Sequence, residues 1–161
     1  MASQMQMAAQ FPPVTILPAA ADAAGRTGAW LNLRNALKTW IVVEVNQGNA
    51  ATVALTLLQA QDVSGTGSKV LSASVPIWYQ ANTASTDLNV AQAAAANFTT
   101  DANVYDKIVI FEILPETALD VANGFKTIAV QTGASNAANI TEALLIVAER
   151  YQGQSQPSTY S

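Results

Sequence analysis

The chain has 161 residues, half of them hydrophobic, with a formal net charge of −4 and only 11% charged residues. It contains no histidine and no cysteine, which excludes disulfides, thiolate or imidazole metal sites, and catalytic triads built on either residue. Seven Lys and Arg residues without a basic cluster do not suit a nucleic-acid-binding protein. Globular proteins average about 25% charged residues, so this weakly charged surface favours a chain that packs against neighbouring subunits over a neutral-surfaced secreted domain.

Residues 1–27 are expected to form an extended N-terminal arm. Pro12, Pro13 and Pro18 disfavour a helix and a central strand in this stretch. The arm also carries four apolar residues suited to lie on a surface: Phe11, Val14, Ile16 and Leu17. Because the chain is poor in charge, we expect that surface to belong to a neighbouring subunit rather than to the arm's own domain.

The body, residues 28–151, reads as strands separated by Gly, Asn and Pro turns. KTWIVVEVNQ (38–47) is rich in β-branched residues, and ATVALTLLQAQ (51–61) alternates apolar and polar residues with period two. The turn residues NQGN (46–49) lie between them, so we predict a hairpin over 40–60. Further strands are expected at 28–35, 69–82 (with Pro76 at an edge or bulge), 105–115, 125–133 and 140–151.

Two segments are less regular. DLNVAQAAAANFTT (87–100) fits either a short helix or a strand with an alanine-rich loop, and ETALDVANG (116–124) predicts a short helical turn or loop. About eight strands without regular strand–helix alternation predict a mainly β fold, a single antiparallel β-sandwich, of which the jelly roll is one form. A polar tail is expected at 152–161.

DVSGTGSK (62–69) has the composition of a nucleotide-binding loop but not its spacing. A phosphate-binding loop has its lysine directly after the last glycine and a hydroxyl residue after the lysine. Here Lys69 comes one residue late and Val70 follows it. A calcium loop would need more carboxylates than Asp62 alone. We therefore predict a hairpin loop in which Gly65 and Gly67 permit tight turning.

Carboxylates and aromatic residues are the remaining candidates for a site. Glu44, Glu112 and Glu142 fall in predicted strands, and a hydrolase with paired carboxylates is one alternative. Isolated strand glutamates more often face solvent, so we expect no enzymatic activity, no cofactor and no metal. Trp78 and Tyr79 point to opposite faces of their strand, which leaves one of them available to a partner or a glycan.

Two segments, WIVVEVNQGNAATVALTLLQAQDVSGTGSKVL (40–71) and LDVANGFKTIAVQTGASNAANITEALLIVAERYQG (119–153), resemble small structural proteins of tailed bacteriophages and prophages. The resemblance covers roughly 30–153. It rests on the strand pair followed by Asp-Val-Ser-Gly-Thr-Gly-x-Lys, on Leu-Asp…Asn-Gly-Phe, and on the Arg-Tyr at 150–151. It implies a non-enzymatic virion protein of β fold, a head decoration (cement) protein that clamps capsid subunits.

This resemblance implies the major capsid protein as partner, a homo-oligomer (dimer or trimer), and neither nucleic acid nor membrane. The start MASQMQMAAQ lacks the features of a signal peptide, so we expect synthesis in the host bacterial cytoplasm and a final place on the capsid exterior of the virion. A tail or fibre component, or a receptor- or glycan-binding module of the virion, is the alternative. The residues expected to bind the partner are Phe11, Val14, Ile16, Leu17, Trp78 and Tyr79.

Overall fold

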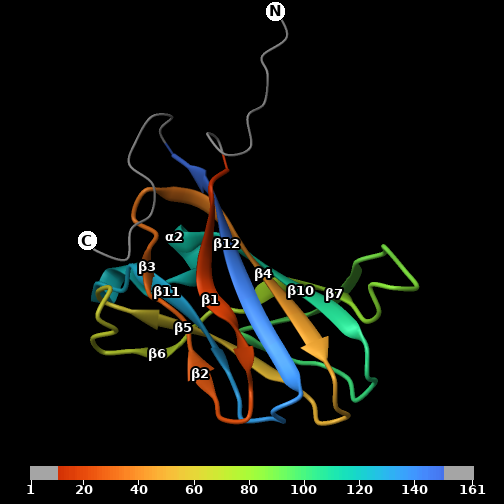
Figure 1. Ribbon diagram of the computed structural model, residues 1–161. Helices are drawn as coiled ribbons and strands as arrows, with labels where there is room; N and C mark the ends of the chain where they lie inside the picture. The colour runs from red at the N-terminus through yellow and green to blue at the C-terminus, as the bar shows by residue number, and fades with distance from the viewer. Residues whose placement is uncertain (1–10, 151–161) are drawn as a thin grey trace, which may run out of the picture.

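Two antiparallel β-sheets pack face to face in the computed structural model, which describes residues 11–150 (Figure 1). In sheet A the strands follow the order β1 (Pro13–Ala21), β12 (Asn139–Glu149), β4 (Ala36–Gln47), β10 (Asp106–Ile113), β7 (Val75–Gln80) and β8 (Val90–Ala95). In sheet B the order is β2 (Arg26–Thr27), β11 (Thr127–Thr132), β5 (Ala54–Ala60) and β6 (Lys69–Val70), with β3 (Leu31–Asn32) beside β11 and β9 (Asn97–Thr99) beside β5.

This arrangement confirms a mainly β fold with a sandwich of two antiparallel sheets; its jelly-roll form stays a prediction. The described residues contain twelve strands instead of about eight, because several pairings involve only two or three residues. The short helical turn expected at 116–124 is present as α2 (Pro115–Ala118) and the 3-10 turn η1 (Val121–Asn123). Within residues 11–150, no helix is long and apolar enough to cross a membrane.

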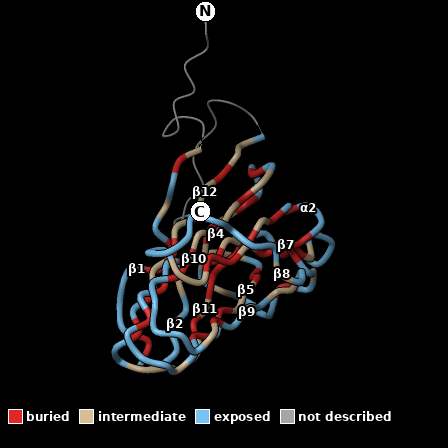
Figure 2. The backbone as a smooth tube through the Cα atoms, turned by 90° about the vertical axis from the view of Figure 1, so that its right-hand side faces the viewer, coloured by how far each residue is buried: buried red, intermediate tan, exposed pale blue. Residues whose placement is uncertain are grey.

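The core lies between the sheets because apolar side chains alternate along the long strands. Ile41, Val43 and Val45 of β4 point inward and are at most 1% exposed, and Leu55 and Leu57 of β5 meet them from sheet B at 0%. Figure 2 shows buried positions in the interior and exposed ones along the loops. Each such side chain contributes about 1.5–3 kcal/mol through its removal from water.

The hairpin predicted over 40–60 is wrong. β4 lies in sheet A between β12 and β10, whereas β5 lies in sheet B beside β11. The link 48–53 therefore crosses from one sheet to the other. Both edges of β4 are occupied by other strands, β12 along its length and β10 from Thr39 to Asn46. The turn residues mark correctly where β4 ends, but they do not determine which strand becomes its neighbour.

The N-terminal segment is extended, as predicted, but its described part belongs to the sandwich and does not reach out as an arm. Residues 13–21 form β1, an edge strand of sheet A that pairs with β12. Pro13 and Pro18 are tolerated because one side of an edge strand needs no ladder hydrogen bonds, and β1 has two register shifts along its length. Ile16 and Leu17 are 0% and 2% exposed in the chain's own core, so this segment lies on its own domain.

The remaining segments were anticipated more closely. The open choice at 87–100 is resolved in favour of strands, because the alanine-rich part is β8 and β9 follows it. Pro76 sits at a register shift of β7 against β8, as expected for a bulge. Residues 28–35 contain only the two-residue strand β3. Residues 1–10 of the predicted arm and the predicted tail at 152–161 lie outside the described residues.

A buried carboxylate joins the two sheets at one end of the sandwich. The Asp22 side chain is 0% exposed and accepts hydrogen bonds from Arg26 Nη2 (3.1 Å), Thr132 Oγ1 (3.0 Å) and Thr141 Oγ1. Thr132 lies in β11 of sheet B and Thr141 lies in β12 of sheet A. Arg26 also donates to the carbonyl oxygens of Pro18 (2.9 Å) and Thr141 (2.8 Å). This network fixes the turn between β1 and β2 against both sheets.

We predict that Asp22→Ala lowers the free energy of unfolding by about 3 kcal/mol, because it leaves a partly buried guanidinium and two buried hydroxyls without their acceptor. Urea unfolding followed by circular dichroism measures the change. Asp87→Ala is the matched control, since Asp87 is exposed and should change stability by less than about 0.5 kcal/mol. Equal stability of the two variants would contradict the role given to Asp22.

Candidate partner-binding surface

The loop DVSGTGSK serves the fold in this structure. It links β5 and β6, which pair antiparallel, so the predicted hairpin loop is confirmed. The Asp62 carboxylate accepts hydrogen bonds from the backbone amides of Ser64 (2.9 Å) and Thr66 (3.1 Å), and Gly65 and Gly67 have φ values of +81° and +64°. Hydrogen bonds from Thr66, and then from Ser64, hold the pKa of Asp62 below its ordinary value. The carboxylate is therefore occupied in closing the turn.

The lysine of this loop is occupied as well. Lys69 Nζ lies 2.7 Å from Asp120 Oδ2 and 4.2 Å from the ring centroid of Phe125. A strand follows Lys69, not the helix N-terminus that a phosphate-binding loop needs. A Cβ atom on Gly65 would lie 2.7 Å from Trp30 Nε1, so Trp30 packs closely on this turn.

The three candidate glutamates do not meet in one cleft. Glu44 and Glu142 are direct partners across β4 and β12. Glu112 lies four residues along β10 from Ile108, the partner of Glu44, which is a separation of roughly 13 Å. Among residues 11–150 no group of three or more carboxylate, histidine or cysteine side chains is arranged to hold a metal ion.

Of the six residues expected to bind a partner, three are buried in the chain itself. Ile16 and Leu17 belong to the core, and Tyr79 is 9% exposed. The Tyr79 hydroxyl donates to Asp101 Oδ2 at 2.9 Å, and burial raises the pKa of Tyr79. Apolar packing inside the sandwich already uses these three side chains, so they are not available at a surface.

Two of the other three lie at or near the outer face of sheet A, whereas Val14, the register partner of the core residue Leu145, faces the inner side. Trp78 points away from the core, opposite to Tyr79, as the sequence predicted. Phe11 stacks edge-on against Trp40, with 6.4 Å between ring centroids, and Trp40 alternates with core residues of β4. Val14 is half-buried and packs against the core.

The outer face of sheet A carries a set of half-buried apolar side chains that we call the apolar face. Leu144, Val42, Ile110 and Trp78 form one row across four strands, because each is the register partner of the next. In Figure 1 this side of β12, β4 and β10 faces the viewer, and no other described element covers it. The apolar face consists of Trp40, Val42, Trp78, Ile108, Ile110, Leu144 and Ile146.

One ion pair borders this face and fixes an aromatic ring. Lys38 Nζ lies 2.7 Å from Glu112 Oε2 and 5.1 Å from the ring centroid of Trp40, while Trp78 Nε1 donates to Glu112 Oε1 at 2.8 Å. The hydrogen bond from Lys38, assisted by that from Trp78, outweighs the effect of burial and holds the pKa of Glu112 below its ordinary value. The polar groups here satisfy one another, so no unpaired charge of this cluster borders the apolar face.

Sequence reasoning missed Trp40, Ile110 and Leu144 as surface residues, although a signal for them exists. The segments WIVVEV, IVIFEI and ALLIVA of β4, β10 and β12 are apolar at consecutive positions. Such runs are typical of strands that are covered on both faces, whereas a sheet with one face in water alternates apolar and polar residues. The chain covers only the inner face of these strands within residues 11–150.

Comparison with known proteins gives little further guidance. No protein-family model matches the chain, and no curated protein matches it significantly. Among solved structures, the crystal structure of the SPBc2 prophage-derived protein YomS is similar with a TM-score of 0.46 and 11% sequence identity, over 84% of this chain and 90% of that one. A likeness at this level does not establish a shared function.

We predict that the stability difference between the wild type and Glu112→Gln depends on pH. The folded-state pKa of Glu112 lies below its ordinary 4.5, so the ion pair stabilises the fold above that pH and loses its effect as pH falls through the folded-state value. Urea unfolding should therefore show the wild type more stable at pH 7, with the gap shrinking below about pH 4.5. A gap that stays constant down to about pH 2 would contradict this assignment.

Proposed function

We propose that this protein is a non-enzymatic virion protein that binds the capsid lattice of a tailed phage and stabilises the head as a decoration, or cement, protein. The observation that carries the proposal is the apolar face, which the described residues leave uncovered on three central strands that are apolar on both sides. The similarity of segments 40–71 and 119–153 to phage structural proteins supports this kind of partner.

Burial of the apolar face against capsid subunits would supply the binding energy. Removal of one isoleucine or leucine side chain from water is worth about 1.5–3 kcal/mol at most, and the cost of association offsets part of the total. Many copies on one lattice, each joining adjacent subunits, would strengthen a modest individual contact through multivalency. In this proposal the protein is a homo-oligomer, a dimer or trimer, on the capsid exterior of the virion.

A tail, fibre or receptor-binding role is the second candidate, and one observation favours it. The rings of Trp40 and Trp78 both lie beside the Lys38–Glu112 ion pair. Aromatic rings next to charged hydrogen-bonding groups also suit the recognition of sugars. Phe11 adds a third ring at Trp40.

We predict that Ile110→Lys reduces binding to bare capsids at least tenfold and leaves the fold intact. Ile110 lies at the centre of the apolar face, where a charged side chain remains solvated in the free protein but would be desolvated on docking. Co-sedimentation of the purified protein with capsids that lack it measures the affinity, and circular dichroism checks the fold.

Thr56→Lys is the matched control, because Thr56 is half-buried in β5 of sheet B and lies outside the apolar face. Its capsid affinity should equal that of the wild type. Unchanged capsid binding by Ile110→Lys would overturn the docking face. The receptor-binding candidate would be favoured instead if the wild type does not bind capsids but binds glycans, and if Ile110→Lys reduces that glycan binding.

A further inference from the structure

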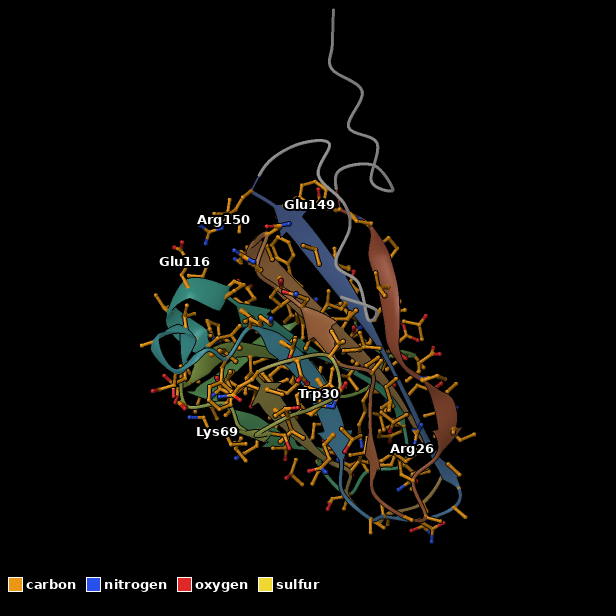
Figure 3. The ribbon with its side chains drawn as sticks, turned by 90° about the vertical axis from the view of Figure 1, so that its left-hand side faces the viewer. Arg26, Trp30, Lys69, Glu116, Glu149 and Arg150 are labelled. Carbon is orange, nitrogen blue, oxygen red and sulfur yellow. The ribbon has the colours of Figure 1, made fainter. Side chains whose placement is uncertain are left out.

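A surface pocket of about 260 Å³ lies beside α2, away from the apolar face. Leu33, Leu119 and Phe125 line it with apolar side chains, and Arg34 and Lys126 stand at its edge. Arg150, which follows β12, completes the lining and pairs with Glu116. Figure 3 shows Arg150 and Glu116 at the end of the sandwich opposite to Arg26. We call this the basic pocket.

The two cations at its edge differ from every other cation of the chain. All seven Lys and Arg residues lie in the part of the chain that the structure describes, and five form ion pairs. Arg34 and Lys126 have no ion pair within residues 11–150, and both are exposed. A protein with a net charge of −4 therefore places together, beside an apolar pocket, the two cations that make no direct ion pair within residues 11–150, although Lys126 acts on Asp62 at longer range.

The opposite end of the sandwich has complementary chemistry. Asp106 begins β10 and follows two exposed apolar residues, Val104 (52% exposed) and Tyr105 (49% exposed). Glu44 and Glu142 lie nearby and face each other across two strands, where like charges destabilise a sheet. This end is therefore acidic and partly apolar. Along β4 it lies about 26 Å from the end that bears the basic pocket, since Glu44 is eight positions along the strand from Ala36.

The segment at the acidic end is held in a defined conformation. Lys107 has a side chain that is 0% exposed, and its Nζ donates to the carbonyl oxygens of Asp101 (3.1 Å) and Asn103 and to Gln47 Oε1 (3.0 Å). These bonds fix the loop that precedes Val104. A fixed loop loses little conformational entropy on binding, which makes it a suitable recognition element.

We infer that the basic pocket binds the Val104–Asp106 segment of a second copy of this chain, head to tail. Tyr105 would cover the apolar floor formed by Leu33 and Phe125, and the Asp106 carboxylate would pair with Arg34 and Lys126 through charge-assisted hydrogen bonds. One copy uses its pocket and the other its segment, so the contact is heterologous. The remaining free pocket and free segment can bind further copies, and the assembly closes into a ring where the rotation between copies permits. This inference deepens the proposed oligomer but does not require capsid binding.

The test is charge reversal with reciprocal rescue, followed by sedimentation velocity of the full chain over a concentration series. The wild type should self-associate, and added salt should weaken the association. Arg34→Glu with Lys126→Glu, and separately Asp106→Lys, should each weaken it at least tenfold. An equimolar mixture of these two variants should associate again, because each reversed pocket then meets a reversed segment and each native pocket meets a native one.

Asp87→Lys is the matched control, since Asp87 is an exposed acid outside both surfaces and carries the same charge change. It should associate like the wild type. Three results would overturn the inference: a wild type that stays monomeric throughout the micromolar range, variants that associate normally, or a mixture that fails to recover. If Asp87→Lys weakens self-association as much as the other variants do, the inference is also overturned, because the net charge of the protein would then control association instead of the pocket and the segment.

The test of self-association can fail or succeed independently of the test of capsid binding. Ile110→Lys should still self-associate, because Ile110 lies in the apolar face and not in the basic pocket. The variant with Arg34→Glu and Lys126→Glu should keep its single-copy contact with bare capsids, measured at protein concentrations where the wild type is monomeric. Asp106→Asn gives a milder change that removes the charge without reversing it. It should also weaken association, and normal association of this variant would count against the Asp106 contact.

Discussion

The position of β12 between β1 and β4 holds sheet A together. β12 pairs with β4 from Asn139 opposite Gln47 to Glu149 opposite Ala36, and with β1 along its other edge. Among residues 11–150 the register partners of β1 all lie in β12, so the pairing of this Pro-containing strand depends on β12. The apolar face and the basic pocket depend on the same strand, which supplies Leu144 and Ile146 to the first and leads into Arg150 of the second.

Charge is scarce in this protein, and two of its charged side chains fix the segments at one end of the sandwich. Asp22 anchors the turn between β1 and β2, and Lys107 anchors the loop before β10, both through fully buried side chains. The centre of sheet A is neutral, and Lys38 and Glu112 at its border are satisfied by each other. The neutral centre is thus suited to adhesion and the charged ends to orientation, since electrostatic complementarity contributes more to specificity than to affinity.

The sequence predicts which segments form strands better than it predicts how they pair. The period-two pattern of 51–61 located β5, one face of which is buried, and strand-forming apolar residues at 105–115 and 125–133 located β10 and β11. No local pattern indicates that β4 pairs with β12 and β10, since any apolar strand of the chain could pair with its edges equally well. The prolines of β1 disfavour a helix and a central strand, and both a free arm and an edge strand satisfy that condition. The sequence therefore does not distinguish an arm from an edge strand. The apolar face was missed because apolar runs were interpreted as core on both sides.

The pairing of β1 with β12 also determines when the protein becomes competent during its own synthesis. Residues 13–21 emerge from the ribosome early, but their partner strand at 139–149 emerges more than a hundred residues later. Closing such a distant contact is slow, because the chain loses loop entropy before any pairing compensates for it. The apolar face needs β4, β10 and β12 together, so it is not assembled in a nascent chain until β12 has been made. The chain topology thereby delays the completion of sheet A, and with it the apolar face, until its late strand is available.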